Sequence, residues 1–196
     1  MAQDLPEQIR SFVAVHVPSD VIEKIVEVQR ELRRMAKTEE VRWTQPEQMH
    51  VTLRFLGDVP NEKLPALENA LGAAVVGSSP IKLSLEAFGC FPSARNPNVF
   101  WAGLGGAVDA LQQLQARVEA HTNGFTSHEE QRDFHPHLTI GRVKRRGAES
   151  RRLADELTKF RCASFGAWTV REIVLMRSKL SPEGAIHTKL AIVKFS

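Results

Sequence analysis

The chain has 196 residues with a net charge of +3, and 42% of its residues are hydrophobic and 25% charged. This is the composition of a soluble globular protein, long enough for one ordinary domain or two small lobes. No apolar run approaches the ~20 residues of a membrane-spanning helix, and the N-terminus lacks the regions of a secretory signal. The two cysteines, Cys90 and Cys162, form neither a metal-binding spacing nor a disulfide framework. We therefore expect a cytoplasmic protein, whose mildly basic charge permits a nucleic-acid partner without requiring one.

Stretches of alternating apolar residues, typical of strands, and apolar stripes at helical spacing follow one another along the chain. The predicted order is a strand over 11–17, a helix that starts at 18–20, a strand around 50–53, a helix over 64–74, strands over 81–87 and 99–104, a helix over 108–118, a strand around 137–140, a helix over 153–160, and strands over 167–170, 172–177 and 188–195. Paired strands joined by short turns favour antiparallel sheets over a doubly wound parallel sheet. The pattern therefore predicts an α+β fold.

A four-residue phrase occurs twice, as HVTL at residues 50–53 and as HLTI at residues 137–140. Alternation of this kind indicates a half-buried strand, in which residues two apart share a face. The histidine and the threonine of each phrase then lie side by side, and the aliphatic residues point to the core. The two copies are 87 positions apart. This spacing suggests two similar lobes, each of which contributes one His-x-Thr strand to a shared cleft.

The duplicated motif resembles that of the two-histidine phosphoesterase family, and especially its RNA 2',3'-cyclic phosphodiesterase branch, whose members are also called 2'-5' RNA ligases. Three further segments resemble parts of the same family: RSFVAV at residues 10–15, VRWTQPEQM at 41–49 and RSKLSPEG at 177–184. The resemblance therefore extends over nearly the whole chain.

The resemblance implies a single bilobal domain over residues 1–196. It also implies two mainly antiparallel sheets flanked by helices, related by a pseudo-two-fold axis, with a central cleft between the motif strands. The lobes would interleave in sequence, and the two termini would share one lobe.

The chemistry of cyclic phosphate hydrolysis suits such a cleft. The reaction is an in-line displacement, so it needs a base on one side of the phosphorus and an acid on the other. Histidine can serve as either near neutral pH, because its ordinary pKa is about 6.5. Threonine hydroxyls can donate hydrogen bonds to the non-bridging oxygens, where charge builds up. The residues alone do not tell which histidine is the acid.

The family resemblance implies roles for five residues. His50 would be the proton donor and His137 the proton acceptor, while Thr52, Thr139 and Arg142 would bind the substrate phosphate. The implied activity converts RNA 2',3'-cyclic phosphate ends to 2'-phosphomonoester ends without a metal or cofactor, and reversible 2'-5' ligation could accompany it. The expected partners are RNA ends or nucleotides with a 2',3'-cyclic phosphate, tRNA fragments among them. We expect a monomer that does not bind membranes.

A metal site would use the same residues differently. His135 and His137 lie on one predicted strand face, and His50 could complete a three-histidine zinc shell. Against such a shell, the paired threonines would have no use, and Gln48 stands where the first motif would need its second histidine.

A binding role and a different substrate are also compatible with the motifs. The protein could be a non-catalytic module that binds RNA ends. A group of basic residues could then steer the RNA backbone, and in the alternative interpretation they are only a solvated face: Lys144, Arg145, Arg146, Arg151 and Arg152. It could also act on another cyclic phosphate, such as ADP-ribose 1'',2''-cyclic phosphate, or on a 2'-5' linkage, because the motifs suit all of these.

The remaining histidines and the aromatic residues carry weaker expectations. His121, His128 and His187 are predicted to lie in loops or on the surface. The aromatic residues say little about base stacking, although Phe55, Phe100 or Trp101 could supply a platform.

Overall fold

A computed structural model of the chain describes residues 7–36, 39–126, 133–160, 165–181 and 184–196. Within these ranges there are four α-helices: α1 (Ser19–Met35), α2 (Leu64–Val75), α3 (Val108–Thr122) and α4 (Ala148–Leu157). The same ranges contain nine strands: β1 (Gln8–His16), β2 (Val41–Trp43), β3 (His50–Pro60), β4 (Ile81–Phe91), β5 (Val99–Gly106), β6 (His137–Val143), β7 (Ala167–Val170), β8 (Glu172–Ser181) and β9 (Gly184–Lys194). No helix in the described ranges is long and apolar enough to cross a membrane.

The strands form one curled antiparallel sheet in the order β7-β4-β5-β6-β3-β1-β8-β9, and β2 pairs with β6 beside this path. The two motif strands, β3 and β6, meet in the middle through a single residue pair, Val51 and Leu138. This link divides the sheet into a β3 half (β3, β1, β8, β9) and a β6 half (β6, β5, β4, β7, β2). The predicted α+β fold is confirmed, and the two predicted sheets are the two halves of this continuous sheet.

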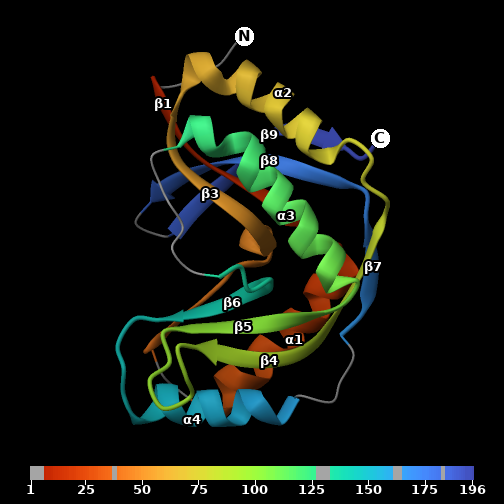
Figure 1. The fold of residues 1–196 in the computed structure, drawn as a ribbon. Coiled ribbons are helices and arrows are strands. Elements are labelled where there is room, and N and C mark those ends of the chain that lie inside the picture. Colours follow the sequence, from red (N-terminus) through yellow and green to blue (C-terminus); the bar gives the residue numbers. More distant parts are fainter. Residues whose placement is uncertain (1–6, 37–38, 127–132, 161–164, 182–183) are drawn as a thin grey trace.

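The helices cover the two halves separately (Figure 1). Helices α2 and α3 pack together against β9 and β3, whereas α1 and α4 contact each other beside the β6 half. Helix α1 follows β1 in sequence but is bound to the other half, because Gln29 donates hydrogen bonds to the carbonyls of Thr44 and Ile140. Strand β1 and the C-terminal strands β8 and β9 lie together in the β3 half. The halves therefore interleave in sequence.

Each motif strand contains a β-bulge directly after its threonine. Consecutive residues of β1 face Thr52 and Arg54 of β3, and the same register shift follows Thr139 in the pairing of β6 with β5. The extra residue reverses the alternation of faces from that point onward. As a result, the residues five positions after the motif histidines, Phe55 and Arg142, share the face of those histidines and line the same cavity.

The last two strands are longer than the sequence predicts. They pair continuously, from Glu172 opposite Lys194 to Ser181 opposite Gly184, whereas the predicted strands stop at residue 177 and restart at 188. The predicted loop between them includes residues 182–183, which lie outside the described ranges. The added parts of the strands lack a core-facing apolar pattern, because this end of the hairpin borders the cleft and solvent. Leu180 is 68% exposed there.

Candidate active site

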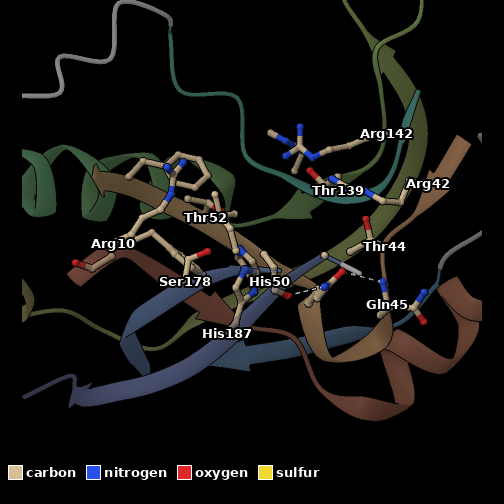
Figure 2. A pocket seen from close by; sticks show the side chains of 18 of the residues that line it. Arg10, Arg42, Thr44, Gln45, His50, Thr52, Thr139, Arg142, Ser178 and His187 are labelled. Atoms are coloured by element: carbon tan, nitrogen blue, oxygen red, sulfur yellow. Dashed lines mark hydrogen bonds between the residues drawn. The ribbon is translucent and has the colours of Figure 1, made fainter. Parts of the chain in front are cut away.

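A cavity of about 620 Å³ lies where the two halves of the sheet meet (Figure 2). Residues from both halves line it, including every site residue that the sequence predicts: His50, Thr52, His137, Thr139 and Arg142. The two His-x-Thr pairs reach the same space because β3 and β6 are neighbours in the sheet and each turns its aliphatic residues to the core. Val51, Leu53, Leu138 and Ile140 are each at most 3% exposed.

The imidazole of His50 is packed between two other rings. It stacks on Phe12, with ring centroids 4.6 Å apart, and lies edge-on to His187 at 5.0 Å. Burial and, to a smaller extent, the nearby His187 lower the pKa of His50 to about 4, while a hydrogen bond with the backbone of Gln48 partly opposes this shift. Because this pKa is below 6.5, His50 is neutral at pH 7 when the cleft holds no anion.

His137 is held by a backbone carbonyl and by the ring of Phe91, whose centroid lies 5.2 Å from that of the imidazole. Its Nδ1 lies 2.6 Å from the backbone carbonyl of His135, and because a carbonyl can only accept, Nδ1 donates this hydrogen bond. The other ring nitrogen, Nε2, is then free to accept a proton. Burial lowers the pKa of His137, partly opposed by the bond to His135. His137 is therefore also neutral at pH 7, in the tautomer that suits a general base.

The three-histidine zinc shell is not assembled. His135 contributes its backbone carbonyl to His137, while its own exposed side chain is absent from the cavity lining. In the part of the chain that the structure describes, no group of three or more His, Cys, Asp or Glu side chains is placed to hold a metal ion.

Arginines make the cleft positive. Arg10, Arg42 and Arg142 come from β1, β2 and β6 and all line the cavity. Burial lowers the pKa of Arg142, and the charge of Arg42 lowers it further, although an arginine remains protonated at physiological pH. Phe55 brings an apolar surface to the same cavity and is 48% exposed.

The prediction that His187 is a loop or surface residue is wrong. His187 lies on β9 opposite Ser178, lines the cavity, and contacts both Phe12 and His50. Its Nδ1 is buried and has no hydrogen-bond partner among the described residues. The resemblance of residues 177–184 to the family was the one sequence signal close to this position, but it did not reveal the pairing of β8 with β9.

A second, smaller cavity of about 160 Å³ shares two residues with the first, His50 and His187. Its other titratable or charged residues are His16, Glu47 and Lys189. The pair of imidazoles therefore separates the main cleft from a second water-accessible space.

Of the three aromatic candidates for a base platform, Phe55 alone lines the cleft. Phe100 is fully buried, with its ring 6.2 Å from that of Trp43. Trp101 is half-buried against Phe91 at 5.2 Å. Strand β5 turns one of its two aromatic residues into the core and the other against β4, so neither has a face open to the cleft. His121 is exposed on α3, as predicted, and His128 lies outside the described ranges.

Two imidazoles beside an arginine-lined wall define the class of this protein: it has the cleft of a phosphoesterase. Comparison with known families makes the class specific. The chain belongs to the LigT like Phosphoesterase family, whose model matches residues 15–101 and 105–187. The resemblance to the two-histidine phosphoesterases is thereby confirmed.

Relatives in this family match the chain over almost its full length. A protein of Archaeoglobus fulgidus named RNA 2',3'-cyclic phosphodiesterase is 36% identical over 185 residues, which covers 94% of this chain and 99% of the relative. A protein of the same name from Methanothermobacter thermautotrophicus is 31% identical over 190 residues, covering 95% and 99%. The crystal structure of the Thermus thermophilus protein TT0787 has a TM-score of 0.73 and 27% identity, covering 95% of this chain and 98% of that one.

Proposed function

We propose that this protein hydrolyses RNA 2',3'-cyclic phosphate ends to 2'-phosphomonoester ends, by general acid–base catalysis through His50 and His137 and without a metal ion. One observation carries the proposal: two His-x-Thr strands are neighbours in one sheet and direct both imidazoles and both hydroxyls into one positive cavity. The relatives named RNA 2',3'-cyclic phosphodiesterase support the choice of substrate.

His137 is the base in this proposal. Its Nε2 takes a proton from water, and the water oxygen forms a bond to phosphorus while the bond from phosphorus to the 3'-oxygen breaks. His50 gives a proton to the departing 3'-oxygen, and the phosphate stays on the 2'-oxygen. With a 5'-hydroxyl in place of water, the same groups in the same roles would form a 2'-5' linkage, and with exchanged roles they would cleave it back to the cyclic phosphate.

Because the pKa of His50 is low, His50 would become protonated, and so able to act as the acid, only when the substrate is bound. In the free protein His50 is neutral at pH 7, because its pKa is about 4. A bound phosphodiester carries a negative charge, which favours the imidazolium and raises this pKa. Thr52 and Thr139 would donate hydrogen bonds to the non-bridging oxygens, and the guanidinium of Arg142 would stabilise the added charge.

His187 would act as a positioning residue. Together with Phe12 it fixes the ring of His50 from two sides, and a fixed ring holds its proton in line with the leaving oxygen. A positive charge on one imidazole disfavours a positive charge on its neighbour, so His187 would also keep His50 neutral until substrate binds.

The unit that carries this activity would be the single bilobal domain, residues 1–196, acting as a cytoplasmic monomer on RNA ends such as those of tRNA fragments. Both halves of the sheet contribute catalytic groups, so neither half could act alone.

The first test is incubation of the purified protein with a short RNA ending in a 2',3'-cyclic phosphate in excess EDTA, followed by identification of the product. A 2'-phosphate end is expected. Reaction only after zinc is added would replace the proposal with metal catalysis. Absence of reaction under both conditions would favour another cyclic phosphate, a 2'-5' linkage or a binding role, and a 2'-5'-linked dinucleotide would be tried next.

A further inference from the structure

Two arginines of the β6 half face each other across a strand pair. Arg42 of β2 and Arg142 of β6 are direct partners in the antiparallel ladder, and both side chains are exposed and line the cleft. Like charges directly opposite each other destabilise a sheet. The side-chain ion pairs that are seen in the described residues lie elsewhere, on α4 and the turn after it. An anion between the two guanidinium groups would relieve this repulsion.

The pair is displaced from the reacting phosphate. Because the bulge adds one residue between them, Arg142 lies two ladder positions from Thr139, opposite Val99 where Thr139 is opposite Trp101, or about 7 Å along the strand at ~3.3 Å per residue. Arg42 lies beside Arg142 on the far side from β5, and Figure 2 shows both arginines next to Thr139. Arg142 can reach back to the phosphate that Thr139 binds, whereas Arg42 is placed for the next group along a chain.

The positive charge extends furthest on the side of the β6 half. After Arg142, β6 ends in a turn that carries the exposed residues Lys144, Arg145 and Arg146. At the position equivalent to Arg142 in the β3 half, the cleft presents the apolar ring of Phe55. Arg10 of the β3 half also lines the cleft, but it stands opposite Asp58 in the ladder, so the positive surface extends further along the β6 half.

We propose that Arg42, together with Arg142, forms a second phosphate subsite that binds the phosphodiester on the 5' side of the cyclic end. This inference rests on the proposed function and specifies the substrate: a chain of several ribonucleotides is turned over better than a 2',3'-cyclic mononucleotide, which has no such phosphodiester.

The test compares cytidine 2',3'-cyclic phosphate with tri- and hexanucleotides that end in a cyclic phosphate. In the wild-type protein kcat/KM should rise from the mononucleotide to the trinucleotide. Arg42→Gln should reduce the ratio of the trinucleotide value to the mononucleotide value about tenfold, as expected for one charge-assisted hydrogen bond. Arg42→Lys, which keeps the charge, should recover part of the ratio. Arg30→Gln on α1, outside the cleft lining, is the matched control and should leave the ratio unaltered.

Binding of a fluorescent hexanucleotide with a 2'-phosphate end gives a readout that does not depend on turnover. Arg42→Gln should lower the slope of log Kd against log salt by about 0.7, the value for one phosphate contact to a single strand. The inference is wrong if wild-type kcat/KM does not depend on length, or if Arg42→Gln weakens mononucleotide and trinucleotide turnover equally. If the proposed function itself is wrong, no cyclic phosphate of any length is hydrolysed. The dependence of hexanucleotide binding on salt would still test the subsite in that case.

Discussion

The two motif strands, β3 and β6, have the same backbone plan but different side chains around it. Both place a histidine and a threonine on the cleft face, and both contain a bulge after the threonine. Both then return the fifth residue after the histidine to that face, yet this residue is Phe55 on β3 and Arg142 on β6. The backbone conformation that β3 and β6 share determines which positions face the cleft. The side chain at each of these positions determines whether that wall of the cleft is apolar or positively charged.

The two imidazoles share part of their surroundings. Each has a hydrogen bond with the backbone of the residue two positions earlier, and each contacts a phenyl ring, Phe12 for His50 and Phe91 for His137. His50 also lies against His187, and its pKa falls to about 4. His137 is held by a backbone carbonyl, which fixes its tautomer. His50 differs in having a second imidazole, His187, beside it, so its protonated form needs the negative charge of a bound phosphate. The acid role of His50 and the base role of His137 come from the family resemblance.

Removal of either imidazole should have the largest effect. His50→Ala and His137→Ala are each expected to lower kcat about 10²- to 10⁴-fold, because each removes one half of the acid–base pair. The double variant should be little worse than either single one, since the two groups act as a unit. Steady-state kinetics with a cyclic-phosphate RNA measures this effect, with His121→Ala on α3 as the control. Activity retained by one variant would remove that histidine from the mechanism.

Alanine substitution of Phe55 and of Arg142, the fifth residue after each motif histidine, should distinguish what the two walls of the cleft contribute to substrate binding. Arg142→Ala is expected to raise KM about 10- to 100-fold, because a charge-assisted hydrogen bond to phosphate is lost. Phe55→Ala should raise KM less and only for substrates with a base. Inorganic phosphate, tested as a competitive inhibitor, distinguishes them: Arg142→Ala should weaken its inhibition, and Phe55→Ala should not. A KM that does not change in Arg142→Ala would contradict its assignment.

The two threonines should be nearly equivalent. Thr52→Ala and Thr139→Ala are each expected to reduce kcat about threefold to tenfold, the range for one neutral hydrogen bond. Thr→Ser at either position keeps the hydroxyl and should recover most of the rate. Single-turnover measurements report this step directly. A large loss at one threonine only would show that the two strands do not share the phosphate evenly.

The smallest expected effect is a shift of the pH profile in His187→Phe. A phenyl ring preserves the packing on His50 and Phe12, but the imidazole that lowers the pKa of His50 is gone. The pKa of His50 should rise, so more of it is protonated at neutral pH and the alkaline limb of the bell-shaped profile moves to higher pH.

An NMR titration of the His50 ring checks this shift directly. The other charged neighbours are kept in the variant: Arg142 and His137 in the main cleft, and His16, Glu47 and Lys189 at the smaller cavity. An unchanged or lower pKa would mean that His187 only fills space.

Much of the site is readable from the sequence because it depends on local periodicity. Alternation within residues 50–53 and 137–140 determines that each histidine shares a face with its threonine. The repetition of the phrase indicates two related halves, and the sequence also predicts the helices and most strands.

The tertiary structure decided the features that depend on pairing between distant strands. Strict alternation would turn Arg142 away from His137, and the bulge formed against β5 returns it to the cleft. His187 reaches His50 because β9 pairs with β8 and β8 with β1, and the pairing of β2 with β6 brings Arg42 opposite Arg142. A sequence specifies the face of each residue relative to its near neighbours, but register and strand order arise from contacts between remote segments, and these bring the histidines and the arginines to one cleft.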